Sequence, residues 1–173
     1  MAKRTNSGRK PGRAALRRVK LLVFDFDGVM TDNRVLTLED GTEGVLCNRS
    51  DGLGVGLARE AGLAMLVLSK EQNAVVAARC RKLKLECLHG IDDKAGALTA
   101  ILRARGVKAA ETAYVGNDVN DVACLRMVGM PIVVADAWPA ARAAAKFVTT
   151  RAGGHGAVRE VCDWFVAARG REA

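Results

Sequence analysis

The chain has 173 residues, of which 50% are hydrophobic and only 4% aromatic, and it carries a formal net charge of +8. This length accommodates one domain with a proper hydrophobic core. No apolar run approaches the roughly 20 residues of a membrane-spanning helix, and there is no signal-peptide core, so we expect no membrane association. The five scattered cysteines include no CxxC pair, which argues against a disulfide framework or a zinc site and indicates a cytoplasmic protein with reduced thiols.

The positive charge is concentrated at the N-terminus. Eight of the 27 Lys and Arg residues lie within residues 1–20, which contain no acid, so 19 basic residues remain against 19 acidic ones. We expect residues 1–18 to be a disordered, solvated leader. An arm attracted to RNA or to a membrane surface and a transit-like leader are the alternatives. The folded body is neutral and gives no reason to expect a nucleic-acid partner.

The first half of the chain reads as strand, hairpin, helix and strand. Residues 19–26 form an apolar run typical of a buried strand. Two short runs then surround Asp40-Gly41, a dipeptide that favours a tight hairpin. Residues 51–61 have a helical pattern that Gly62 ends, and residues 63–69 form a second core strand.

The second half continues the alternation. We expect helices at 73–83, 93–106, about 122–128 and 155–169, and strands at 86–90, 112–118 and 131–136. Such alternation predicts an α/β domain with a largely parallel sheet. No internal repeat and no second domain is visible, so residues 19–170 are predicted to form a single domain.

Polar side chains stand at the carboxyl ends of several predicted strands. Asp25 and Asp27 end the first strand, Ser69 the second, and Asn117 and Asp118 a later one. Lys94 begins the helix that follows a further strand. Ligands of parallel α/β sheets bind outside the carboxyl ends of the strands. The sequence therefore predicts that these groups meet at one sheet edge.

Those residue types suit phosphoryl transfer. Asp25, Asp27 and Asp118 form an all-oxygen set of the kind that holds Mg²⁺ with water and phosphate. Lys94 supplies a cation and Ser69 a hydrogen-bond donor for the phosphoryl oxygens. Asp25 is the candidate nucleophile that forms an aspartyl-phosphate. Asp27 is the candidate acid that protonates the leaving oxygen and then activates water.

This assembly resembles the haloacid dehalogenase (HAD) superfamily of phosphatases over about residues 19–169. Its four motifs occur in order: "DFDGVMTD" from Asp25, Ser69, Lys94 in "DDK", and "GNDVND" with Asp118 and the supporting residues Asn117 and Asp121. Receiver domains of response regulators also combine acids, a hydroxyl and a lysine, but in another order. The resemblance implies a Rossmann-like α/β fold with a mainly parallel sheet flanked by helices, a β-hairpin flap and Mg²⁺ dependence. The short intervals between motifs imply that there is no cap domain.

Within the superfamily the chain is similar to a small capless branch. That branch includes 3-deoxy-manno-octulosonate 8-phosphate phosphatases, nonulosonate 9-phosphate phosphatases and the phosphatase-like domain of some acylneuraminate cytidylyltransferases. The resemblance implies a phosphorylated sugar acid as substrate and a homotetramer whose hairpins and C-terminal segments complete neighbouring sites. The resemblance implies that Asn48, Arg49, Ser50, Asp51, Gly52 and Arg79 help bind the substrate.

One segment departs from the octulosonate enzymes. They usually carry Thr-Gly-Arg where this chain has "SKEQ", residues 69–72. An arginine expected at the substrate is therefore absent, and Lys70 is a candidate replacement, although it also fits an exposed loop lysine. The difference favours a nine-carbon 9-phosphate over an eight-carbon 8-phosphate. The rival interpretation is a catalytically weak oligomerisation or regulatory domain associated with an acylneuraminate cytidylyltransferase, but all motif residues are intact.

Overall fold

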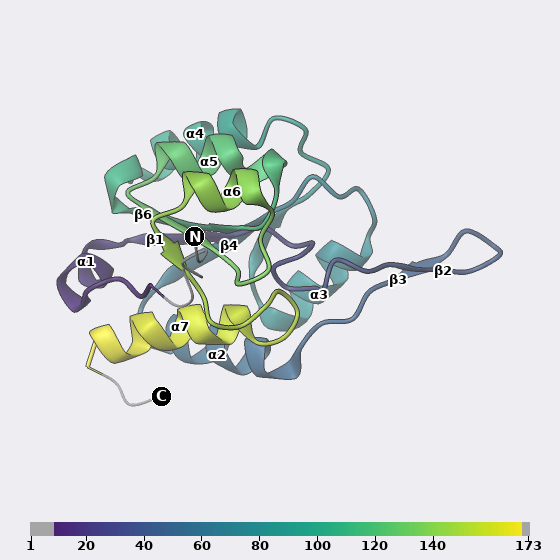
Figure 1. Ribbon diagram of the computed structural model, residues 1–173, viewed down its shortest axis with the longest axis horizontal. Helices are drawn as coiled ribbons and strands as arrows, with labels where there is room; N and C mark the ends of the chain where they lie inside the picture. The colour runs from purple at the N-terminus through teal and green to yellow at the C-terminus, as the bar shows by residue number, and fades with distance from the viewer. Residues whose placement is uncertain (1–8, 171–173) are drawn as a thin grey trace, which may run out of the picture.

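The computed structural model describes residues 9–170 and shows three layers built around one parallel sheet (Figure 1). The six strands lie in the order β5-β4-β1-β6-β7-β8, and every neighbouring pair is parallel. Their bounds are β1 Leu21–Phe24, β4 Ala64–Leu68, β5 Glu86–Leu88, β6 Thr112–Gly116, β7 Met130–Val133 and β8 Phe147–Val148. The predicted mainly parallel α/β fold is confirmed.

Helices cover both faces of this sheet. Figure 1 shows α4, α5 and α6 along one face and α2, α3 and α7 along the other. The helices are α1 Arg13–Arg18, α2 Arg49–Glu60, α3 Val75–Leu83, α4 Lys94–Arg105, α5 Val122–Met127, α6 Pro139–Ala144 and α7 Ala157–Ala168. Short 3₁₀ turns occupy Ala109–Glu111 and Val119–Asp121.

The central strand explains the depth of the core. All four residues of β1 are buried, because β4 and β6 flank the strand and helices cover it above and below. A strand buried on both faces reads as a continuous apolar run rather than an alternating one. This apolar run ends at the edge of the sheet, where Asp25 follows Phe24 directly.

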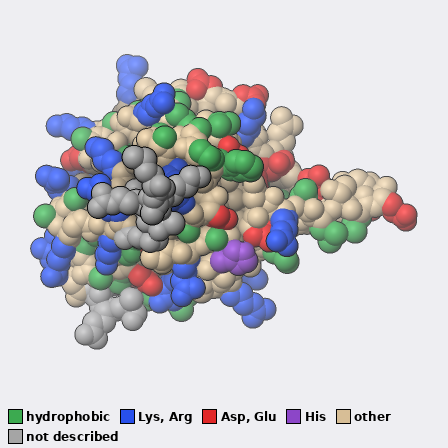
Figure 2. Space-filling view, in the orientation of Figure 1, with side chains coloured by type: hydrophobic (Ala, Val, Ile, Leu, Met, Phe, Trp, Pro, Cys, Tyr) green, Lys and Arg blue, Asp and Glu red, His purple; other side chains and the backbone are tan. Residues whose placement is uncertain are grey.

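A two-stranded ribbon projects from the body (Figure 1). It consists of β2, Leu36–Thr37, and β3, Glu43–Gly44, which pair antiparallel. Figure 2 shows hydrophobic side chains along this projection. The exposed large hydrophobic residues of the hairpin are Val35, Leu36, Leu38 and Leu46. A two-stranded ribbon with so little apolar burial is marginal by itself.

The structure differs from the sequence prediction near the N-terminus. Arg13–Arg18, within the stretch expected to be disordered, forms α1, which packs on α7 and buries Leu16. The guanidinium groups of Arg13 and Arg17 donate hydrogen bonds to the Ala168 carbonyl. Residues 1–8 lie outside the described part of the chain.

Two short elements were not predicted either. Helix α6 and strand β8 follow β7, and β8 forms the last strand at that edge of the sheet. Both are at most six residues long, too short for a hydrophobic period to be recognised. Within residues 9–170, no helix has the length and apolar character that crossing a membrane requires.

Candidate active site

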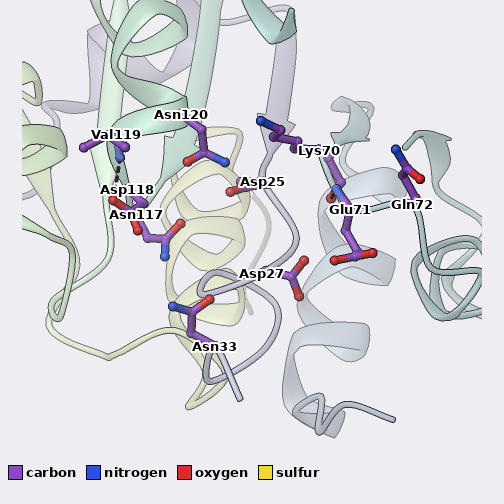
Figure 3. A pocket seen from close by; sticks show the side chains of 11 residues that line it. Asp25, Asp27, Asn33, Lys70, Glu71, Gln72, Asn117, Asp118, Val119 and Asn120 are labelled. Carbon is purple, nitrogen blue, oxygen red and sulfur yellow. Dashed lines mark hydrogen bonds between the residues drawn. The ribbon is translucent and has the colours of Figure 1, made fainter. Parts of the chain in front are cut away.

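A polar cavity of about 480 Å³ lies at the carboxyl ends of β1, β4 and β6 (Figure 3). The structure brings Asp25, Asp27, Ser69 and Asp118 together on its wall. The complete lining is Asp25, Asp27, Asn33, Ser69, Lys70, Glu71, Gln72, Asn117, Asp118, Val119 and Asn120. Four carboxylates, including Glu71, and the Ser69 hydroxyl thus share one space although they come from three separate parts of the sequence.

Beneath the cavity wall, Lys94 joins two carboxylates. Its Nζ lies 2.7 Å from Oδ1 of Asp25 and 2.8 Å from Oδ1 of Asp121. All three residues are nearly fully buried. Burial lowers the pKa of Lys94, but the two carboxylates outweigh it and the net shift is upward, so the amine is held as a cation. Lys94 is at the start of α4, directly after the capping residue Asp93.

Asp121 anchors this network from the side away from the cavity. It accepts hydrogen bonds from Tyr114 Oη at 2.7 Å and from the backbone N of Asn117 and Asp118 at 2.8 and 3.3 Å. A Cβ at Gly116 would lie 2.5 Å from its carboxylate oxygen, so only glycine leaves room for this contact. The network fixes the loop that carries Asp118.

Asp25 has an environment that opposes its charge. Burial, and then the carboxylate of Asp121, raise its pKa to about 8, although Lys94 and the Phe26 backbone N–H act in the opposite direction. One lysine therefore does not neutralise both acids. A further cation at the cavity side of Asp25 would favour its ionised form, and the oxygen donors there are those that Mg²⁺ prefers.

Asp27 is less buried and leans toward the outer part of the cavity. Burial, followed by the charge of Glu71, raises its pKa, while Lys94 and a hydrogen bond with the Thr31 side chain lower it. A raised pKa suits a carboxyl group that gives and takes a proton. The turn after Asp27 requires Gly28, whose φ is +74° and whose Cβ would lie 1.9 Å from the Asn117 side chain.

The third acid, Asp118, points to its own loop. Its Oδ1 accepts a hydrogen bond from the Val119 backbone N at 2.6 Å (Figure 3). In residues 9–170, no three His, Cys, Asp or Glu side chains already converge as a metal-binding group. The donor set of the cavity fits Mg²⁺ in its chemistry, because carboxylate oxygens are ligands that this ion prefers.

Ser69 directly follows the last residue of β4 and is buried. Its Oγ accepts a hydrogen bond from the Glu71 backbone N at 3.1 Å, which leaves the hydroxyl hydrogen free to donate. Lys70 also lines the cavity, but its Nζ lies 3.5 Å from Asp92 and its side chain is 58% exposed.

The other expected substrate-binding residues lie outside this cavity in a single chain. They are Asn48, Arg49, Ser50, Asp51, Gly52 and Arg79. Arg79 donates from Nη2 to the Asn48 carbonyl at 2.9 Å, and Asp51 accepts a hydrogen bond from the Arg159 backbone N at 2.9 Å. In this geometry both side chains serve the junction of α2, α3 and α7.

Several lining residues were not predicted as site residues: Asn33, Glu71, Gln72, Val119 and Asn120. Their sequence positions could have indicated them, because each lies in a connecting segment close to a predicted site residue. Glu71, two residues after Ser69, matters most for the charge of the cavity.

Comparisons with known proteins agree with this geometry. Residues 67–161 match the family model of the haloacid dehalogenase-like hydrolases. The chain is 34% identical to the 3-deoxy-D-manno-octulosonate 8-phosphate phosphatase KdsC of Escherichia coli K12, over 88% of this chain and 82% of that protein. It is 33% identical to N-acylneuraminate cytidylyltransferase A of Danio rerio, over 84% of this chain but only 34% of that protein.

Solved structures of related proteins also resemble the structure of this chain. A HAD-family protein from Streptomyces avermitilis has a TM-score of 0.85 and 49% identity, with coverage of 91% of this chain and 89% of that one. The octulosonate 8-phosphate phosphatase of Moraxella catarrhalis, in complex with magnesium, phosphate and KDO, has a TM-score of 0.86 and 30% identity, with coverage of 90% of each chain. The chain therefore belongs to the haloacid dehalogenase-like hydrolases, and within them it is a phosphatase.

Proposed function

We propose that this chain is a Mg²⁺-dependent phosphatase that removes phosphate from a phosphorylated ulosonic acid through an aspartyl-phosphate on Asp25. The observation that carries the proposal is the cavity that Asp25, Asp27, Ser69 and Asp118 line together, with Lys94 in contact with Asp25. The similarity to KdsC phosphatases supports the substrate class.

In the first step a carboxylate oxygen of Asp25 attacks phosphorus. The bond from phosphorus to the leaving oxygen breaks, and Asp27 gives that oxygen a proton, so the products are an alcohol and an acyl-phosphate. In the second step Asp27 takes a proton from water, which attacks the same phosphorus. Inorganic phosphate leaves, and Asp25 is regenerated.

The surrounding groups have separate tasks. Lys94 balances the charge of Asp25 from the protein side, and the Ser69 hydroxyl donates a hydrogen bond to a phosphoryl oxygen. Asp25, Asp27 and Asp118 are the proposed ligands of Mg²⁺, with Asp118 turned from Val119 toward the cavity. When bound, Mg²⁺ neutralises negative charge on the phosphate and favours the ionised form of Asp25.

The segment at residues 69–71 bears on the size of the sugar acid. Ser-Lys-Glu at residues 69–71 stands where octulosonate enzymes usually have Thr-Gly-Arg, which favours a nine-carbon 9-phosphate. Lys70 lines the cavity and is the available cation there. Arg49 and Arg79 are proposed to reach the substrate only if the cavity is completed by another chain.

We also propose a homotetramer. The open cavity and the exposed leucine and valine side chains of the hairpin support this assembly, because apolar surface on so small a ribbon gains stability when it packs against a neighbour. A catalytically inert assembly domain is the rival, and the intact set of acids, serine and lysine argues against it.

A panel of phosphorylated sugar acids and neutral phosphosugars, assayed for phosphate release with and without Mg²⁺, tests the proposal. The expected result is Mg²⁺-dependent release that is fastest with an ulosonic acid phosphate. Release from none of the esters would contradict the proposed activity.

A further inference from the structure

Two of the five free cysteines, Cys80 and Cys87, lie on neighbouring elements, α3 and β5. Cys80 is nearly fully buried in the second half of α3, on the helix face that also buries Val76. The backbone N of Leu85 donates a hydrogen bond to the Cys80 carbonyl at 3.0 Å, so the chain turns directly from the helix into β5. The two cysteines therefore belong to one short helix–turn–strand unit.

The direction of the Cys87 side chain follows from its neighbour Glu86. Glu86 forms an ion pair with Arg105 of α4, so its side chain points to the sheet face that α4 covers. Successive side chains of a strand point to opposite faces. Cys87 therefore points to the other face, where α3 lies (Figure 1), and its thiol is in hydrogen-bonding contact with the Cys80 thiol.

Cys87 is the more reactive thiol of the pair. It is half-buried on β5, an edge strand of the sheet, so small solutes reach it more easily than they reach Cys80. The hydrogen bond from Cys80 lowers the pKa of Cys87, although burial acts in the opposite direction. The half-buried thiol of Cys47 lies nearby, but burial raises its pKa. Thiolate character and access together decide which cysteine an oxidant attacks.

We propose that Cys80 and Cys87 form a redox-sensitive modification site, which hydrogen peroxide converts to a reversible disulfide that slows the phosphatase. The Cys87 sulfur attacks one peroxide oxygen, the O–O bond breaks, and the leaving hydroxide takes up the Cys87 proton as water. The Cys80 sulfur then attacks the sulfur of the resulting sulfenic acid, the S–O bond breaks, and the oxygen leaves as water with the Cys80 proton. Two thiols are oxidised and one peroxide is reduced to two waters. Disulfides of this transient kind occur in reducing compartments.

The disulfide acts on the active site through the carboxyl end of β5. A disulfide holds its sulfur atoms about 2 Å apart, closer than two thiols in contact, so α3 and β5 have to shift. Leu88, next to Cys87, accepts a hydrogen bond from the Ser69 backbone N at 2.8 Å, and the Gly90 N donates to the Glu71 carbonyl at 2.8 Å. A shift of β5 therefore reaches the segment that carries Ser69. This effect on activity rests on the proposed phosphatase function, whereas the formation of the disulfide does not.

Peptide mapping detects the cross-link. Reduced protein is treated with hydrogen peroxide, quenched with catalase, denatured, alkylated and digested with trypsin without reductant. Trypsin cuts after Arg81, Lys82 and Lys84, between the two cysteines, so the disulfide joins two peptides that dithiothreitol separates. We expect this joined pair in the wild type.

Three variants identify the thiols. Cys87→Ala should give no joined pair, and in Cys80→Ala dimedone should label the sulfenic acid of Cys87. Cys47→Ala removes the nearby half-buried thiol and is the matched control, so it should give as much of the joined pair as the wild type. Absence of the pair from the wild type, or a disulfide or sulfenic acid on Cys47 in place of Cys87, would overturn the modification site.

Phosphate release tests the effect on activity separately. Oxidation should slow release by the wild type several-fold, dithiothreitol should restore it, and Cys87→Ala should keep its rate through the same treatment. A cross-linked wild type that releases phosphate at the rate of the reduced protein would overturn the effect on the phosphatase. Reduced protein that releases phosphate from no ester would overturn the proposed function, and the joined peptides would still report on the disulfide.

Discussion

The ammonium nitrogen of Lys94 lies 2.7 Å from Oδ1 of Asp25, and both side chains are almost completely buried. Asp121 lies on the other side of the same nitrogen, at 2.8 Å. One buried cation thus serves two carboxylates. The excess negative charge is on the cavity side, where the phosphatase needs a second cation to bring Asp25 and a phosphate dianion together.

Removal of the Lys94 charge should lower the stability of the fold as well as the phosphatase activity. Lys94→Met leaves two buried carboxylates without a cationic partner, a change that typically costs about 3–5 kcal/mol of unfolding free energy. Urea denaturation followed by circular dichroism measures this loss. Lys70→Met, at an exposed lysine of the same cavity, is the control and should change stability little. Equal stability of the two variants would contradict the network described above.

Asp118 should control metal affinity through its charge. Asp118→Asn retains an acceptor for the Val119 N–H, so the loop cap is preserved, but it replaces an anionic ligand with a neutral one. We expect Mg²⁺ affinity, measured by titration calorimetry on metal-free protein, to fall by roughly tenfold or more. Asn120→Ala changes another residue of the cavity wall and should leave the affinity nearly unchanged. A larger loss of Mg²⁺ affinity in Asn120→Ala than in Asp118→Asn would exclude Asp118 as a ligand.

The hairpin should determine the oligomeric state. Leu36 and Leu46 are 64% and 77% exposed in the single chain, so Leu36→Asp with Leu46→Asp would place charges in the proposed interface. We expect light scattering to show a homotetramer for the wild type and smaller species for this variant. Leu53→Asp changes a leucine on α2 that is 58% exposed and is the comparison. A fully active wild-type monomer would contradict the proposed assembly.

Asp51 should make stability depend on pH. Burial raises its pKa from 3.8 to about 6, against the lowering effects of the Arg159 backbone N–H and the charges of Arg79 and Arg151. Since the folded state holds the proton more tightly, the contribution of Asp51 is complete below pH 3.8 and is lost as the pH rises through about 6.

Asp51→Asn removes this titration and keeps an acceptor for the Arg159 N–H. The unfolding free energy of the wild type, measured relative to Asp51→Asn, should fall by about 2–3 kcal/mol between acidic and neutral pH. A difference that stays constant over that range would show that Asp51 is not buried as described.

The sequence was most informative where apolar strands end in polar residues. Asp25, Ser69 and Asp118 could be placed at one sheet edge because parallel strands that follow one another through helices end on the same side. The chemistry of the cavity could be predicted for the same reason, since few other roles explain acids directly after a buried strand.

The side-chain contacts could not be predicted in this way. That Arg79 contacts the Asn48 carbonyl depends on the packing of α2 against α3, and no local pattern encodes that distance. The hydrogen bond from Tyr114 to Asp121 spans the interior between β6 and the following loop. Helix α1 was missed because its stability comes from contact with α7, while its own composition is basic and resembles a solvated leader.

The nucleophilic role of Asp25 is tested most directly by trapping the phosphoenzyme. With p-nitrophenyl phosphate the leaving group needs no proton, so Asp27→Asn can still be phosphorylated but cannot activate water efficiently. After acid quench in the presence of Mg²⁺, intact-protein mass spectrometry should show one added phosphoryl group on Asp27→Asn, located in the peptide that contains Asp25. Asp25→Asn with Asp27→Asn should carry none, and Asp25→Asn alone should release no phosphate. Wild-type phosphate release by Asp25→Asn, or a phosphoryl group on another peptide, would contradict the account.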